Sequence, residues 1–248
     1  MATDDKTAHF NGTDFIGYFL ARRGLTAQTA GIGKALVMTW IHPGSLVQEV
    51  GAEPAALGRY GITTAGDVSI LRAPPGAPAT AMLMEEMLPL GVRHFVGVGL
   101  CGSLDPALPI GSLLIAGEAH RDEGTSYHYL DSKMRVSPSP VVVAALRQAA
   151  GEEIPVVPHW TTDAIYRETK GKIRRRQAAG VKSVDMEASA VYAVASCRGA
   201  EAALVLAVSD ELWGPTWRAG FEDEALLEAK QRALQIGWKA GQILASEH

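Results

Sequence analysis

Two carboxylates in this chain stand where an α/β sheet would present them to a ligand. Asp210 comes directly after the apolar run 202–208, which is typical of a buried strand. In open α/β sheets ligands bind beyond the carboxyl ends of the strands, so an acid at this position is placed to contact one. The alternative is that Asp210 only caps the segment that follows it.

Glu187 is the second candidate. It follows the short apolar run 181–184 and lies in the first turn of the helix that we expect over 186–197. A carboxylate in a first turn complements the helix dipole. That structural role is the alternative to a role in binding.

A glycine-rich stretch separates two further apolar runs. The segment 97–102 has the pattern G-x-G-x-x-G, which in dinucleotide-binding proteins opens a helix. Here Pro106 and Pro109 follow, and proline removes the amide donors of a helix interior. The apolar run 112–116 then predicts a strand. We therefore expect a strand–glycine turn–strand unit, which either binds an anion or a sugar through its amides or is only a tight turn.

Alternating strands and helices are expected to position these residues. The expected strands are 35–41, 68–71, a run from His94, 112–116, 154–157, 181–184 and 202–208. The expected helices are 14–23, 45–50, 78–90, 140–149, 169–178, 186–197 and 222–246. This alternation predicts a layered α/β fold, in which helices cover a largely parallel sheet.

Composition limits the remaining possibilities. The 248 residues include 47% hydrophobic and 20% charged residues, which is enough apolar material for a core. We expect a single domain over 1–248, with residues 1–12 loose. The net charge of −4 gives no support for binding nucleic acid or an anionic membrane.

The two cysteines cannot form a disulfide framework, and no Cys/His spacing matches a zinc site, so we expect no metal. The N-terminus lacks the apolar core of a signal peptide, and no apolar run is long enough to span a membrane. By elimination, we expect a cytoplasmic protein.

Several motifs together resemble one family. They are VGLCGSL, IGSLLIAGEAHRDEGTSYHYL, TTDAIYRET, VDMEASAVYAVA and VLAVSDEL. They resemble the nucleoside phosphorylase family, which includes uridine phosphorylases, hexameric purine nucleoside phosphorylases and methylthioadenosine nucleosidases. The resemblance spans residues 66–246. It implies a three-layer phosphorylase/hydrolase-like α/β fold, with a central mixed sheet flanked by helices.

The resemblance also implies an activity. Such enzymes cleave the N-glycosidic bond of a nucleoside, by default with phosphate as the acceptor and with no cofactor. They assemble as homodimers or as hexamers (trimers of dimers). In this chain Asp210 would protonate the leaving base and Arg218 would assist, while Met186 and Glu187 would hold the ribose. The other residues expected at the nucleoside are Ile165, Tyr166, Cys101 and Gly102.

The base pocket differs from the family pattern. Ile165 stands where the family often has a phenylalanine, and the Gln and Arg that read uracil in uridine phosphorylases have no counterpart in YRETKGK. Trp217 either walls this pocket or packs in the core or at an interface.

The phosphate site differs most. Gly97 and Leu100 stand where the family has an arginine and a serine or threonine. Losing an arginine removes charge-assisted contacts to phosphate. The site for phosphate or water is expected around Gly44, Gly99 and Leu100, with Arg59 as the first replacement cation. Two alternatives follow: a hydrolase that uses water, and a non-catalytic nucleoside-binding protein.

Overall fold

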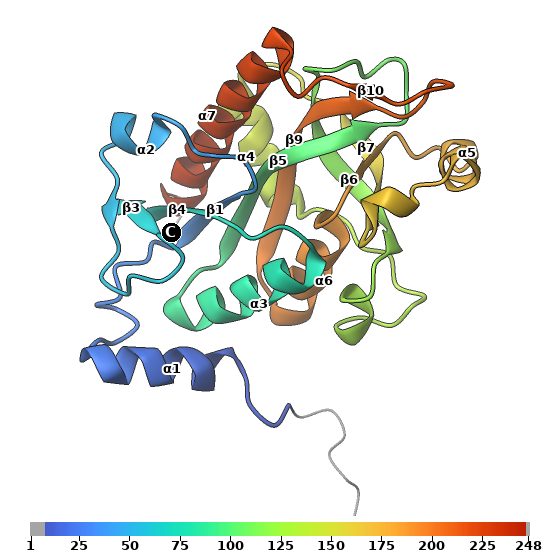
Figure 1. The fold of residues 1–248 in the computed structure, drawn as a ribbon. Coiled ribbons are helices and arrows are strands. Elements are labelled where there is room, and N and C mark those ends of the chain that lie inside the picture. The colour runs from blue at the N-terminus through green and yellow to red at the C-terminus, as the bar shows by residue number, and fades with distance from the viewer. Residues whose placement is uncertain (1–7, 247–248) are drawn as a thin grey trace, which may run out of the picture.

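The computed structural model describes residues 8–246, which are arranged around one mixed ten-stranded sheet (Figure 1). Its strands are β1 (Ala35–Thr39), β2 (Glu53–Pro54), β3 (Thr63–Ala65), β4 (Val68–Arg72), β5 (His94–Ser103), β6 (Leu113–Asp122), β7 (Val156–Thr162), β8 (Ser183–Asp185), β9 (Glu201–Glu211) and β10 (Arg218–Ala219).

The helices are α1 (Gly12–Arg23), α2 (Leu46–Glu49), α3 (Ala77–Met87), α4 (Pro140–Ala150), α5 (Lys170–Ala178), α6 (Ala188–Arg198) and α7 (Glu224–Ser246). Short 3-10 turns are η1 (Leu88–Leu90), η2 (Ser126–His128) and η3 (Ile165–Arg167). No helix among residues 8–246 is both long enough and apolar enough to cross a membrane.

Five of the strands close into a ring. β5 pairs with β9, β9 with β6, β6 with β7, β7 with β8, and β8 returns to β5. The parallel strands β1 and β4 extend the sheet from β5, and the short β3 and β2 complete that side. The ring brings the carboxyl ends of β5, β7, β8 and β9 close to one another.

Helices cover the sheet in two layers. In Figure 1, α4 and α7 lie on one side of the sheet and α3 and α6 on the other. The side chains of β1 alternate between these layers: Leu36 and Met38 pack with the α6 side, whereas Ala35 and Val37 pack with α7. The expected three-layer α/β fold with a central mixed sheet is confirmed.

The prediction of a glycine turn is wrong. Gly97, Gly99 and Gly102 all lie inside β5, which runs without a turn to Ser103. A Cβ atom on Gly97 would lie 2.5 Å from Cγ of Leu204, so these glycines let neighbouring side chains pack closely against the strand. The connection to β6 comes later, between Ser103 and Leu113, and contains Pro106 and Pro109.

Other boundaries also differ from expectation. β9 continues to Glu211, so Asp210 lies within the strand and not after it. Glu187 is the N-cap residue of α6, not a member of its first turn. The looseness expected for residues 1–12 falls largely on 1–7, which lie outside the described residues, while Gly12 already begins α1.

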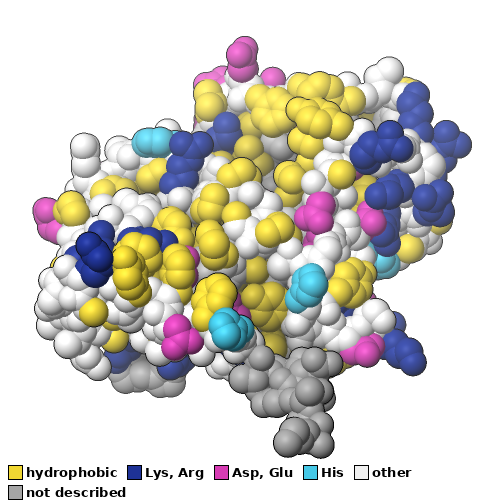
Figure 2. All heavy atoms as spheres, turned by 60° about the horizontal axis from the view of Figure 1, so that its bottom comes forward, with side chains coloured by type: hydrophobic (Ala, Val, Ile, Leu, Met, Phe, Trp, Pro, Cys, Tyr) yellow, Lys and Arg dark blue, Asp and Glu magenta, His cyan; other side chains and the backbone are white. Residues whose placement is uncertain are grey.

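Some large apolar side chains reach the surface. Phe15 and Tyr18 of α1 and Met82 of α3 are exposed. Figure 2 turns this side of the molecule forward and shows apolar groups spread over it between charged ones.

Candidate functional site

Glu187 is held in a buried position by two loops. Only 7% of the residue is exposed. Its Oε1 accepts a 2.6 Å hydrogen bond from the amide of Gly76, and its Oε2 accepts one of 3.3 Å from Met186. Although Glu187 is the N-cap residue of α6, its side chain does not cap that helix. Gly76 has φ 96°, which is unfavourable for other residues, so the partner amide depends on glycine.

A second acid, Asp185, lies beside Glu187 at the end of β8. Its Oδ1 accepts 2.8 Å from Thr161 Oγ1, and its Oδ2 accepts 2.8 Å from the amide of Ala188. The buried His159 has Nε2 3.0 Å from the same Oδ1. Burial and then the charge of Asp185 raise the pKa of Glu187 to about 8.

Asp210 accepts hydrogen bonds on both carboxylate oxygens. Ser209 Oγ donates to Oδ1 at 2.7 Å, and the indole Nε1 of Trp217 donates to Oδ2 at 2.8 Å. Gly102 of the neighbouring strand β5 faces this carboxylate: a Cβ atom on Gly102 would lie 3.4 Å from Oδ2 of Asp210. The structure therefore brings Gly102 and Asp210 together, as expected for two sides of one site.

Cys101 lies in β5, which pairs with β8 and with β9, the strands that carry Asp185 and Asp210. Its thiol is buried, and burial raises its pKa well above the usual range, with smaller contributions from Asp185 and from Asp210. Gly102, the next residue of β5, pairs with Val184 of β8 and with Asp210 of β9, so the Glu187 side and the Asp210 side lie at a common edge of the sheet.

Glu168 is a further candidate residue, which the sequence reasoning missed. It directly follows η3 and is half-buried. Burial and then the charge of Asp210 raise its pKa to about 7, whereas Lys172 opposes the shift. The available indication was a carboxylate shortly after the end of a strand, within the same TDAIYRET motif.

Arg218 does not contact Asp210. In β10 its guanidinium lies 3.0 Å from Glu211 Oε1 and 3.6 Å from Asp223 Oδ2. Trp217, its neighbour in the chain, occupies the position beside Asp210 in which Arg218 was expected to assist.

Two of the residues expected at the nucleoside are exposed. Ile165 is 44% exposed and Tyr166 is 95% exposed. Met186, in contrast, is half-buried next to Glu187. Of the residues expected at the nucleoside, those that the fold brings together are therefore Met186, Glu187, Cys101, Gly102 and Asp210.

Trp40 covers the strand where the phosphate residues were expected. A Cβ atom on Gly97 would lie 3.0 Å from its Cζ3, and one on Gly99 would lie 3.1 Å from its Cε3. The indole is fixed by a 3.2 Å hydrogen bond from Nε1 to the carbonyl of Pro74. The sequence reasoning missed Trp40, because nothing in the sequence indicated that its ring folds back over β5.

The other residues expected near phosphate have local partners. Leu100 is partly buried and packs against two clusters of the apolar core, one on each side of the sheet. Gly44 lies in an exposed turn, where its amide donates 3.0 Å to His42 Nδ1.

Arg59 is engaged between α1 and α3. Its guanidinium lies 4.2 Å from the ring centre of Phe19 and donates to Glu86 at 2.9 Å and to Tyr60 at 3.1 Å. These contacts give the cation a packing role that accounts for its position.

The loop after β6 is tied to the Glu187 side of the site. Glu123 is buried and accepts hydrogen bonds from the amides of Thr125 (2.6 Å) and Ser126 (2.9 Å). Its other oxygen accepts 2.8 Å from Ser189 Oγ, in the first turn of α6. This loop therefore braces the start of the helix that follows Glu187.

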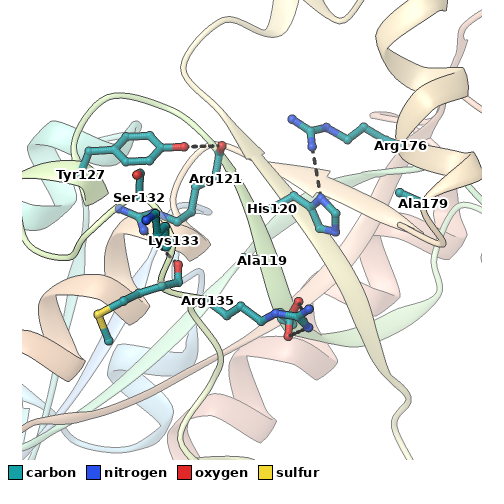
Figure 3. Close-up of a pocket in the computed structure, with 11 residues that line it drawn as sticks. Ala119, His120, Arg121, Tyr127, Ser132, Lys133, Arg135, Arg176 and Ala179 are labelled. Carbon is teal, nitrogen blue, oxygen red and sulfur yellow. Dashed lines mark hydrogen bonds and ion pairs between the residues drawn. The ribbon is translucent and has the colours of Figure 1, made fainter.

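A basic hollow of about 500 Å³ lies elsewhere, along β6 and α5 (Figure 3). Arg176 points at His120 Nδ1 (3.2 Å), Arg135 pairs with Glu118 (3.1 Å), and Arg121 donates to the carbonyls of residues 130, 131 and 134. The lining contains none of the residues expected at the site, and all three of its arginines already have partners.

Comparison with known proteins decides the family. Residues 45–240 match the family model described as "Phosphorylase superfamily". The chain belongs to the phosphorylase superfamily. This phosphorylase-superfamily chain is 30% identical over 177 residues to a guanosine phosphorylase of Halorubrum lacusprofundi, covering 68% of this chain and 73% of the relative. It is 27% identical over 197 residues to a uridine phosphorylase of Treponema pallidum, covering 73% and 74%.

Solved structures share the fold of this phosphorylase-superfamily protein. Purine nucleoside phosphorylase from Toxoplasma gondii, in complex with immucillin-H, aligns with a TM-score of 0.76 and 22% identity over 88% of this chain and 94% of its own. AMP nucleosidase from Bacteroides thetaiotaomicron aligns with a TM-score of 0.76 and 19% identity over 96% and 100%.

Proposed function

We propose that the protein cleaves the N-glycosidic bond of a ribonucleoside. The observation that carries this proposal is the pair of acids at one sheet edge: Glu187, buried and held by the Gly76 amide, and Asp210, with both oxygens engaged over Gly102. In this proposal Glu187 binds the sugar, and Asp210 protonates the leaving base.

Each acid has a defined chemical task. A carboxylate on Glu187 accepts hydrogen bonds from the two vicinal hydroxyls of the ribose, while Met186 packs against the sugar. When the bond between C1′ and the base nitrogen breaks, its electron pair leaves with the base, and the sugar becomes oxocarbenium-like. Asp210 gives a proton to the base, and the acceptor adds to C1′.

The relatives favour phosphate as the acceptor, because those named above are guanosine and uridine phosphorylases. The products are then the free base and ribose 1-phosphate, and no cofactor is needed. Both names also leave purine and uracil nucleosides as candidate substrates.

Water is the second candidate acceptor, and Trp40 favours it. The indole covers Gly97 and Gly99, and Arg59 is committed to Glu86 and Phe19. An acceptor pocket without a guanidinium suits a neutral nucleophile better than a phosphate dianion. The products are then the free base and ribose.

A nucleoside panel tests the proposal. Guanosine, inosine, adenosine and uridine are incubated with the protein, with and without phosphate, and base release is followed by chromatography. We expect release of at least one base. Release only with phosphate identifies a phosphorylase, and equal release in both conditions identifies a hydrolase. Release from none of them in either condition would contradict catalysis and favour a nucleoside-binding protein.

Assembly is part of the same proposal. We expect a homodimer or a hexamer, and the exposed apolar side chains of α1 and α3 suit a contact with a second copy. Light scattering after size exclusion measures the mass directly, and a monomer at micromolar concentration would contradict this expectation.

A further inference from the structure

Trp217 closes the proton-donating oxygen of Asp210. Its indole Nε1 lies 2.8 Å from Oδ2, while Ser209 occupies Oδ1. We propose that Trp217 is a gate on Asp210: its indole holds the carboxylate in the free protein, and the base of the substrate takes its place. This inference rests on the proposed function, because it takes Asp210 as the acid that meets the base.

The chemistry of indole makes this contact informative. The Nε1–H group can donate a hydrogen bond but cannot accept one. In this contact Oδ2 of Asp210 is therefore the acceptor. To protonate a base through Oδ2, Asp210 must first lose the indole, because the N–H group occupies the oxygen to which the base must bind. The bond belongs to the resting protein and not to the reacting one.

Little holds the indole in place apart from this bond. Trp217 is 61% exposed and makes a tilted contact with Phe221, ring centres 6.2 Å apart. It ends the loop between β9 and β10, directly before Arg218, which anchors the two-residue strand β10 to Glu211. A rotation of the Trp217 side chain thus opens Asp210 without disturbing the pairing of β10 with β9.

The solvent side is where a base could reach Asp210. On the β5 side the side chain of Leu212 fills the space beside Gly102, where a Cβ atom would lie 2.4 Å from its Cδ1, whereas the indole on Oδ2 is largely exposed. A planar base that approaches from solvent meets the indole first. Once the indole has left, Oδ2 takes up a proton from solvent and donates it to the ring nitrogen of the base.

Kinetics of Trp217→Phe test the gate, with Trp213→Phe in the same loop as the matched control. Phenylalanine keeps an aromatic ring but removes the donor together with part of the indole, and the control undergoes the same loss of ring size. We expect KM for the nucleoside to fall about threefold to tenfold, since a bond lost on binding no longer opposes it. We expect kcat to stay within about twofold, and the control to match the wild type. An unchanged or higher KM in Trp217→Phe would overturn the gate.

Indole ¹H–¹⁵N resonances give a readout that does not depend on turnover. Five tryptophans are present, and the resonance absent from Trp217→Phe is that of Trp217. We expect it to move when the nucleoside panel and free guanine, hypoxanthine, adenine and uracil are titrated in. Cleavage without any movement overturns the gate and leaves the proposed function standing. Movement of the resonance without cleavage supports the gate and contradicts the proposed catalysis. If the resonance does not move and no nucleoside is cleaved, both proposals are contradicted.

Discussion

Glu187 Oε1 and the amide of Gly76 are joined by a 2.6 Å hydrogen bond across 111 residues of sequence. The bond fastens the turn before α3 to the turn before α6. It orients a carboxyl group that burial has made hard to ionise, since its pKa is raised to about 8. The sugar side of the proposed site therefore has a fixed position and a titratable state, and both can be tested.

Replacing Glu187 should cost activity far more than stability. In Glu187→Gln two charge-assisted contacts to the ribose hydroxyls become neutral, and charged hydrogen bonds contribute about 1.5–3 kcal/mol each. We expect kcat/KM to fall by roughly 10²–10⁴, with a melting temperature close to that of the wild type. Wild-type turnover in this variant would show that Glu187 only supports the fold.

Activity and stability should respond to pH in opposite directions. If the carboxylate is the form that binds ribose, kcat/KM rises with pH up to about 8, where Glu187 ionises. Stability behaves otherwise, because a folded-state pKa of about 8 lies above the ordinary value of 4.5. The folded protein then holds a proton that the unfolded chain has released, so the contribution of Glu187 is complete below pH 4.5 and is lost as pH rises through 8.

Urea unfolding between pH 5 and pH 9 checks that second half. The free energy of unfolding of the wild type, relative to Glu187→Gln, should decrease by up to about 1.4 kcal/mol per pH unit. Parallel curves for the two proteins would show that Glu187 does not titrate in this range.

Asp210→Asn should separate substrates by their leaving groups. The amide keeps the shape and removes the acid, which should lower the rate on natural nucleosides by roughly 10²–10⁴. In a nitrophenyl riboside the leaving group is nitrophenolate, which departs without protonation, so the rate on this substrate should be affected much less. Equal losses on both substrates would count against an acid role for Asp210.

Phosphate should not saturate the protein in the low-millimolar range. Trp40 covers Gly97, and Leu100 offers no hydroxyl. An arginine–phosphate fork is bidentate, and losing contacts of about 1.5–3 kcal/mol each weakens phosphate by powers of ten. The dependence on phosphate is measured as initial rates of base release at phosphate concentrations from 0 to about 50 mM, where about 1.4 kcal/mol of lost binding energy corresponds to a tenfold weaker affinity. Saturation with ribose 1-phosphate as product would contradict it.

Arg59→Ala should change stability and leave the response to phosphate unaltered. The substitution removes the ring contact with Phe19 and leaves the buried Glu86 with only Tyr60 as a side-chain donor. We expect a loss of about 1–3 kcal/mol by urea unfolding. The variant Arg22→Ala, at an exposed position of α1, which also carries Phe19, should lose far less. A selective loss of phosphate-dependent activity would instead restore Arg59 to the acceptor site.

Much of the architecture follows from apolar patterning. The long helices α3 and α7 and the buried strands β1, β4 and β9 lie within a few residues of expectation, because their periodicity extends over whole elements. The two-residue strands β2 and β10 were not predicted, since two residues carry no period.

The site divides along the same line. Met186, Glu187 and Asp210 could be proposed from the sequence because each lies in a motif at a strand end. Glu168, Trp40 and the contact of Trp217 with Asp210 depend on tertiary packing, which brings side chains together from separate strands. The glycines of β5 misled for that reason: their function is to admit the side chains of Trp40, Leu204 and Leu212, which are remote in the sequence.

The close packing of Trp40 on Gly97 has an evolutionary consequence. An arginine at position 97 would place its Cβ 3.0 Å from the indole and 2.5 Å from Leu204, so it is not accessible by one substitution. A smaller residue at position 40 would relieve only the contact with the indole, and the closer contact with Leu204 would remain. Positions 40, 97 and 204 are therefore epistatic: an arginine at position 97 needs coordinated changes at the other two, so the acceptor side of the site is constrained by packing that is remote in sequence.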